Sequence, residues 1–173
     1  VRIPYISLSE LEMEFRTQIK ALIPAGRRPT HLDLHALRIH KRPEVGDLLF
    51  RLAREFGLAL RVRGQTMIDS LQAQGFPTND YDFLDSYLLE PEGKREQYIK
   101  LLRELPEGLS EWAIHPGLDH PELLSLEPAG RHERQRDYDF WTSPEAKAII
   151  EQEGIILLDY GPLQELWQVH ARL

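Results

Sequence analysis

The sequence predicts an α/β protein in which helices cover a parallel sheet or barrel, within one globular domain or part of one. Three observations support this prediction, the first for the fold class and the other two for the domain. Short runs typical of strands alternate along the chain with apolar stripes at helical spacing. The 173 residues are 42% hydrophobic and 28% charged, which is ordinary for one globular domain of moderate size. No linker or internal repeat divides the chain, so we expect residues 1–173 to form a single domain or part of one.

The first element is a helix with a clear amino-terminal signal. Ser7 and Glu10 have the spacing of a capping box, in which the serine accepts from the first turn and the glutamate reaches back. Apolar residues then recur every three or four positions, and the stripe ends at Pro24 and Gly26. Its members are Leu8, Leu11, Phe15, Ile19 and Leu22.

The segment Thr30–His35 is expected to be a strand, because polar residues and leucines alternate and Pro29 precedes them. On a strand, His31, Asp33 and His35 share one face. Imidazole and carboxylate are ligands of divalent metals, so these residues could form a metal site. A hydrogen-bonded pair of histidines in a half-polar strand fits the spacing as well.

The next elements continue the alternation. A helix begins at Pro43 and ends at Phe56, with Gly57 in the carboxyl-terminal capping position. A strand is expected at Leu58–Val62, followed by a variable region that contains a short amphipathic segment and a turn at Gly75–Pro77.

The second half of the chain repeats the pattern with longer connections. Helices are expected at Glu92–Leu105 and from Pro144 to Gly154, with a weaker helical stripe near the carboxyl end. The charged run Arg131–Asp137 is interpreted as the solvated face of a helix. The expected strands are Asp82–Leu88, Trp112–His115 and the apolar run Ile155–Tyr160, the last of them buried on both faces.

Charge and composition exclude several classes of protein. Lys and Arg number 21 against 28 Asp and Glu, a formal charge of −7, and no basic block offers a surface for nucleic acid. The absence of cysteine leaves only His, Asp and Glu as metal ligands and fits a cytoplasmic protein. No apolar run reaches the roughly 20 residues that span a bilayer. Neither a glycine-rich phosphate loop nor a nucleophile elbow is present.

In parallel α/β folds the chemistry gathers at the carboxyl ends of the strands, where His35, Arg61 and His115 are expected. His35 could bind a metal or cap the strand end. Arg61 could bind an oxygen-rich substrate or pair with an interior carboxylate. His115, before Pro116 and Gly117, could be a general acid near neutral pH or a structural residue.

Other polar residues are weaker candidates. His40 is expected in a solvated loop, and Asp119 could cap the short helix near Pro121 or take part in chemistry. Asp82 and Asp85 are candidates by location alone.

The ordered motifs resemble the YdjC-like carbohydrate deacetylase family, which includes chitooligosaccharide deacetylases and hopanoid-biosynthesis deacetylases. The similarity extends from about Leu11 to Tyr160. The motifs are Arg28–His35, Arg54–Leu58 leading to Arg61, Asp85-Ser86-Tyr87, and Ile114-His115-Pro116-Gly117.

The resemblance implies a deviant (β/α) barrel that removes an N-acetyl group from a sugar by means of a metal-bound water. It implies His35 as a ligand of one divalent ion, Mg²⁺ or Zn²⁺, with His31 and Asp33 in supporting roles that orient it. It also places His115 in the pocket, as an acid or a substrate contact, and leaves Arg61 as a candidate substrate-binding residue.

The chain departs from the family pattern in two places. The family opens with a strand that ends in an Asp-Asp pair, and a further histidine ligand follows; neither motif is present here. We therefore expect the chain to be the carboxyl-terminal portion of a deacetylase barrel, with the remaining metal ligands upstream of Val1. Residues 36–40 also replace the histidine-rich continuation that many members have.

These observations leave three functional hypotheses. The first is the carboxyl-terminal part of a metal-dependent carbohydrate deacetylase, inactive as this fragment alone. The second is a non-catalytic carbohydrate-binding or interaction protein of the same fold, and the third is a metal-dependent hydrolase of another bond, such as a phosphoester. A barrel without its first strands would expose apolar edges, so we expect either another copy or the missing segment to cover them.

Overall fold

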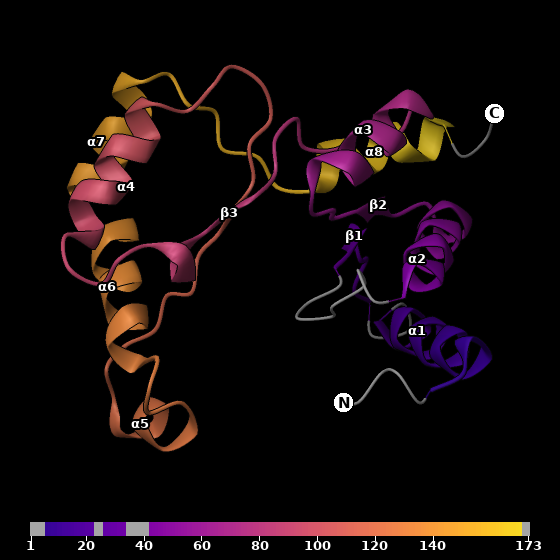
Figure 1. The fold of residues 1–173 in the computed structure, drawn as a ribbon, viewed down its shortest axis with the longest axis horizontal. Helices are drawn as coiled ribbons and strands as arrows, with labels where there is room; N and C mark the ends of the chain where they lie inside the picture. Colours follow the sequence, from indigo (N-terminus) through magenta and orange to yellow (C-terminus); the bar gives the residue numbers. More distant parts are fainter. Residues whose placement is uncertain (1–5, 23–25, 34–41, 171–173) are drawn as a thin grey trace. The chain divides into compact units, whose positions relative to one another are not determined.

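The structure is a computed structural model, and it describes residues 6–22, 26–33 and 42–170 (Figure 1). The chain divides into two compact units. The first unit consists of Val1–Thr78 and Leu158–Leu173, and the second of Asn79–Leu157. In the described residues, each unit contains one pair of parallel strands together with several helices.

In the first unit, two short parallel strands lie between helices. Strand β1 pairs with β2 so that His31 lies opposite Ala59 and Leu32 opposite Leu60. Helix α2 packs against both strands and against α1, and α8 packs against β2 (Figure 1). The elements are α1 (Leu8–Leu22), β1 (His31–Leu32), α2 (Pro43–Phe56), β2 (Ala59–Leu60), α3 (Gln65–Ala73) and α8 (Gly161–His170).

The core of the first unit forms where the apolar face of α2 meets the strands and α8. Leu48 and Leu52 are completely buried, as the helical stripe predicts. Trp167 of α8 is also completely buried and donates its indole N–H to the carbonyl of Pro77 at 2.6 Å. Its ring lies 4.7 Å from that of Phe76. Hydrophobic burial therefore joins the carboxyl-terminal helix to the amino-terminal elements of this unit.

The helix ends follow from local sequence. The backbone N–H of Ser7 donates to Glu10 at 2.9 Å and the N–H of Glu10 donates to the Ser7 hydroxyl at 3.2 Å, which confirms the capping box. Helix α2 begins at Pro43 and ends before Gly57, whose φ of 63° lies in the left-handed region.

We expect Gly57→Ala to lower the free energy of unfolding by about 1–2 kcal/mol through left-handed strain, with a further loss from crowding. A methyl group there would lie 3.1 Å from Cγ of Gln168. Gly26→Ala is the matched control, because Gly26 has a φ of 70° and open space around the added carbon. Urea denaturation should rank Gly57→Ala as the more destabilising variant; equal losses would show that the contact with Gln168 contributes nothing.

The second unit is built on strands β3 and β4, which are parallel and place Leu84 opposite Trp112 and Asp85 opposite Ala113. Helices α4, α6 and α7 pack on one another, and Tyr98, Phe140 and Trp141 form an aromatic cluster between them. The elements are β3 (Leu84–Asp85), the 3₁₀ helix η3 (Ser86–Leu88), α4 (Lys94–Arg103), β4 (Trp112–Ala113), α5 (Pro121–Leu126), α6 (Arg131–Trp141) and α7 (Pro144–Gln152).

Two predictions about the second half of the sequence are wrong. Ile155–Tyr160 is not a buried strand: among the described residues it pairs with no strand, and Ile156 is 81% exposed. An apolar run becomes a buried strand only where a neighbouring strand takes its backbone hydrogen bonds. The run Arg131–Asp137 forms a helix, but its last residue is completely buried rather than solvated.

The mixed α/β architecture with parallel strands and covering helices is confirmed. Closure of the strands into a deviant barrel, and a single domain over residues 1–173, stay predictions. Among residues 6–22, 26–33 and 42–170, no helix has the length and apolar character that crossing a membrane requires.

Candidate functional site

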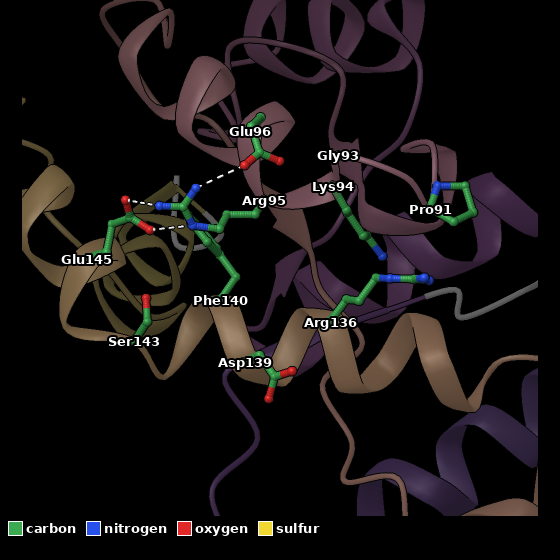
Figure 2. Close-up of a pocket in the computed structure, with 10 residues that line it drawn as sticks. All are labelled: Pro91, Gly93, Lys94, Arg95, Glu96, Arg136, Asp139, Phe140, Ser143 and Glu145. Atoms are coloured by element: carbon green, nitrogen blue, oxygen red, sulfur yellow. Dashed lines mark hydrogen bonds and ion pairs between the residues drawn. The ribbon is translucent and has the colours of Figure 1, made fainter.

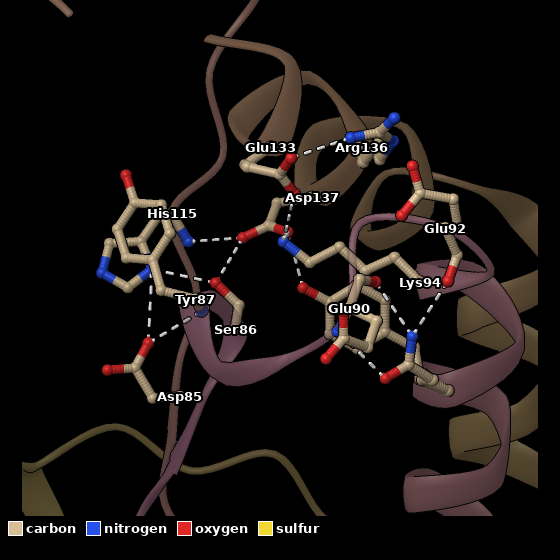
Figure 3. A network of polar contacts seen from close by, with 12 residues as sticks. Asp85, Ser86, Tyr87, Glu90, Glu92, Lys94, His115, Glu133, Arg136 and Asp137 are labelled. Carbon is tan, nitrogen blue, oxygen red and sulfur yellow. Dashed lines mark hydrogen bonds and ion pairs between the residues drawn. The ribbon is translucent and has the colours of Figure 1, made fainter. Parts of the chain in front are cut away.

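Ser86 directly follows β3, His115 lies two residues beyond β4, and the two side chains contact each other. Because the strands are parallel and in register, the residues that follow them project from the same edge. The Ser86 hydroxyl lies 2.9 Å from Nδ1 of His115 (Figure 3). Asp85 caps η3 by accepting from the N–H of Tyr87 at 3.0 Å, and its carboxylate is 3.9 Å from Nδ1 of His115.

The buried carboxylate of Asp137 lies at the centre of this network. Its Oδ2 accepts from the Ser86 hydroxyl at 2.6 Å and from the backbone N–H of His115 at 2.9 Å. Its Oδ1 accepts from the Tyr98 hydroxyl at 2.6 Å and forms an ion pair with Nζ of Lys94, also at 2.6 Å. The ammonium of Lys94 is itself buried, and Glu133 lies 3.7 Å from it. Figure 3 shows these groups converging from η3, α4, α6 and the loop that follows β4.

Asp137 is ionised in the folded state. Burial alone would raise the pKa of the Asp137 carboxyl, but the contacts from Lys94, Ser86, Tyr98 and the His115 backbone outweigh burial and hold that pKa below its usual value. The ionised Asp137 therefore stabilises the fold at pH values above the pKa that this carboxyl has in the unfolded chain. This contribution is lost as the pH falls through the lower pKa that it has in the folded chain.

The imidazole of His115 is partly buried, and the ring of Tyr87 covers it at a centroid distance of 4.0 Å. Burial lowers the pKa of His115 below its ordinary value, and the positive charges of Arg134 and Lys94 act in the same direction. The carboxylates of Asp85 and Asp137 oppose this shift without reversing it. His115 is therefore neutral at neutral pH, and its protonated form is a stronger acid than an exposed histidine.

We expect a pH dependence of stability from this lowered pKa. The unfolded chain takes up the proton at the ordinary histidine pKa, about 6.5, before the folded chain does. The free energy of unfolding should therefore fall as the pH drops below about 6.5, and His115→Gln should remove that part of the slope. Urea denaturation of both proteins between about pH 5 and 7.5 measures the difference; parallel slopes would contradict a lowered pKa.

His31 and Asp33 of the predicted metal strand have partners in the first unit. The ring of His31 stacks on Tyr160 at 3.8 Å and its Nδ1 lies 3.0 Å from the Thr30 hydroxyl. The guanidinium of Arg61 pairs with Asp33 at 3.0 Å, at the carboxyl ends of β2 and β1. Arg61 therefore pairs with a carboxylate, as one alternative for it proposed, but Asp33 is exposed rather than interior. Its role in substrate binding, and those of His31 and Asp33 in orienting a ligand, stay predictions.

Two histidines of the sequence analysis, His35 and His40, lie outside the described residues. In the described part of the chain, no group of three or more His, Asp or Glu side chains could hold a metal ion. Metal binding by His35 therefore stays a prediction.

Asp119 does not cap helix α5. That position belongs to His120, whose Nδ1 accepts from the N–H of Glu122 at 3.4 Å. Asp119 instead faces α6, where its carboxylate lies 3.4 Å from Arg131 and 3.5 Å from His132. The extended backbone of His120 directly precedes Pro121 at the first helical position, so the cap falls one residue later than Asp119.

A hollow of about 390 Å³ lies beside helices α4, α6 and α7 (Figure 2). Its charged side chains already have partners: Arg95 pairs with Glu145 at 2.8 Å, and Arg136 pairs with Glu133 at 2.9 Å. Lys94, at the edge of the hollow, is already paired with Asp137. A polar ligand would have to break these pairs, so the hollow is a weaker candidate than the surroundings of His115.

Sequence reasoning missed the buried ion pair of Asp137 and Lys94. Both lie in charged segments in which their neighbours are exposed, and such segments normally form solvated faces. One available signal was the spacing of Asp137 and Phe140, which places the carboxylate on the buried face of α6 together with an aromatic ring.

Comparison with known proteins identifies the family. Residues 2–152 match the YdjC-like protein family. The chain belongs to that family. A carbohydrate deacetylase of Enterococcus faecalis is 29% identical over 167 residues, which cover 91% of this chain and 62% of the relative. A chitooligosaccharide deacetylase of Escherichia fergusonii is 26% identical over 159 residues, covering 90% and 62%.

A solved structure supports the same relationship. The protein, from Enterococcus faecalis V583, is named for cellobiose-phosphate cleavage and superimposes with a TM-score of 0.76 at 28% identity. The match covers 94% of this chain and 64% of the solved chain. This YdjC-like chain therefore spans about 62% of the length of the curated relatives that it matches.

Proposed function

We propose that this YdjC-like chain is part of a carbohydrate deacetylase that hydrolyses the N-acetyl group of a sugar. The observation that carries the proposal is the family match over residues 2–152. It is supported by relatives named carbohydrate deacetylase and chitooligosaccharide deacetylase, each aligned over about nine tenths of this chain.

His115 is the proposed catalytic acid. Amide hydrolysis needs a proton donor for the leaving amine, and a histidine of lowered pKa is a strong donor once protonated. The contact between Nδ1 and Ser86 leaves Nε2 as the nitrogen that can face a substrate (Figure 3). General acid catalysis by one side chain contributes about 10²–10⁴-fold to the rate.

The remaining roles follow the family resemblance. We propose that His35 binds one divalent ion, Mg²⁺ or Zn²⁺, and that such an ion supplies a Lewis acid and an activated water when bound. Arg61 is the proposed contact for sugar oxygens, with its guanidinium oriented by Asp33. We place the protein in the cytoplasm and expect either a second copy or the remainder of the family fold as its partner.

The test is release of acetate from N-acetylated chitooligosaccharides in the presence of Mg²⁺ or Zn²⁺. Two preparations are compared: the 173-residue chain alone, and the same chain joined to the part of the Enterococcus faecalis deacetylase that has no counterpart in it. We expect acetate from the joined protein and none from the chain alone. Binding of the sugar without acetate release would instead favour a non-catalytic carbohydrate-binding protein.

A second candidate is hydrolysis of a phosphoester in a phosphorylated sugar. The name of the solved relative, which refers to cleavage of cellobiose phosphate without saying which bond is cleaved, points to a phosphorylated sugar as the substrate of this alternative. The same joined protein, incubated with cellobiose phosphate, should release inorganic phosphate if the second candidate holds and none if the first does.

A further inference from the structure

We infer that Ser86 and Asp137 are positioning residues that place the proton of neutral His115 on Nδ1 and leave Nε2 as the reacting nitrogen. The catalytic use of Nε2 rests on the proposed deacetylase function. The position of the proton rests only on the hydrogen bonds described here.

Asp137 carries a negative charge and can only accept hydrogen bonds. A carboxylate that receives two side-chain hydroxyls, a backbone N–H and a buried ammonium is ionised, and an ionised carboxylate only accepts hydrogen bonds. Ser86 has a single hydroxyl proton. At 2.6 Å from Oδ2 of Asp137, the hydroxyl of Ser86 must donate that proton to the carboxylate.

The direction of the next hydrogen bond follows. Because the proton of Ser86 is used by Asp137, its oxygen can offer only a lone pair to Nδ1 of His115, 2.9 Å away. Nδ1 must therefore carry a hydrogen. In neutral His115 this leaves Nε2 without one, as an acceptor, and in protonated His115 the second proton is held on Nε2.

The surroundings make this arrangement rigid. Ser86 and Asp137 are completely buried, so water does not compete for their hydrogen bonds. Oδ2 of Asp137 also accepts a hydrogen bond from the backbone N–H of His115. The same oxygen therefore holds the main chain of His115 directly and its ring through Ser86. Tyr87 covers one face of the ring. Asp85, at 3.9 Å from Nδ1, is too distant to replace Ser86 as its acceptor.

The chain of hydrogen bonds from Asp137 through Ser86 to His115, called the relay below, changes the preferred tautomer of the histidine. A neutral histidine in water favours the tautomer with its proton on Nε2, and Ser86 and Asp137 reverse that preference. Nε2, which points away from the relay, then alternates between a hydrogen-bond acceptor without a proton and a proton donor, as a general acid that is reprotonated in each cycle requires.

The test is an NMR measurement of the two ring nitrogens of His115, by long-range proton–nitrogen correlation in the 173-residue chain, at a pH where His115 is neutral. The His115 signals are assigned by their loss in His115→Gln. We expect the wild type to show a protonated Nδ1 and a bare Nε2. We expect Ser86→Ala to move the proton toward Nε2, since it removes the acceptor of Nδ1.

Ser125→Ala is the matched control, because Ser125 is exposed on α5 in the same unit and donates to the carbonyl of Glu122. It should leave the tautomer of His115 unchanged. A wild-type spectrum with the proton on Nε2 would overturn the inference, and so would a folded Ser86→Ala that keeps the wild-type tautomer. If Ser86→Ala does not fold, the wild-type spectrum alone decides.

The activity of the joined protein separates this inference from the proposed function. Ser86→Ala should lower kcat roughly 10- to 100-fold, on the scale of other residues that orient an imidazole, with KM unchanged. A protein that releases no acetate but shows the expected tautomer would refute the deacetylase function and leave the relay intact. Full deacetylase activity in a folded Ser86→Ala would refute the positioning role alone.

Discussion

Replacing Asp137 by asparagine is expected to lower the free energy of unfolding of the second unit by about 3–5 kcal/mol. The substitution keeps the shape of the side chain but removes the charge that compensates the buried ammonium of Lys94, 2.6 Å away. It also places an amide N–H₂ group among groups that all donate. Urea denaturation followed by tryptophan fluorescence measures the loss, because Trp112 and Trp141 belong to this unit.

Two further variants decide whether the ion pair is the cause. Asp139→Asn alters an exposed carboxylate on the same helix, and we expect a change below about 0.5 kcal/mol. Adding Lys94→Met to Asp137→Asn removes the uncompensated ammonium and should recover part of the loss. A double variant no more stable than Asp137→Asn would contradict this explanation.

Replacing His115 by glutamine is expected to lower kcat for acetate release about 10²–10⁴-fold in the joined protein. Glutamine keeps a polar side chain but has no group that exchanges a proton near neutral pH. His132→Gln is the matched control, since His132 lies on α6 with 59% of its side chain exposed. A folded His115→Gln with wild-type kcat would show that His115 is not the acid.

Local signals predicted the helices accurately. The capping box of Ser7 and Glu10 and the pair Pro43 and Gly57 define ends that the structure reproduces, because such ends depend on neighbouring residues alone. The strands were harder to predict. β1 to β4 are two residues long in the structure, and the apolar run Ile155–Tyr160 is not a strand, because pairing depends on chain that is distant in sequence.

In the candidate site, too, residues marked by a local motif were found, and residues defined by contacts between distant segments were missed. His115 was found from its own motif, and the structure places it just past the carboxyl end of β4, two residues beyond Ala113. Asp137 and Lys94 were missed. The spacing of Asp137 and Phe140 was one available signal for a buried carboxylate, but the ion pair joins α4 to α6 across a separation that no spacing rule covers. The pairing of Asp33 with Arg61 likewise joins two strands whose register the sequence does not reveal.

A simultaneous assay of acetate and free amine tests the deacetylase function most directly. The joined protein is incubated with N-acetylated chitooligosaccharide and divalent metal, with His115→Gln in parallel. The deacetylase proposal predicts acetate and free amino groups in equal amounts, and a large loss of both in the variant. Absence of both products from a folded, metal-supplied protein, together with phosphate release from cellobiose phosphate, would contradict it.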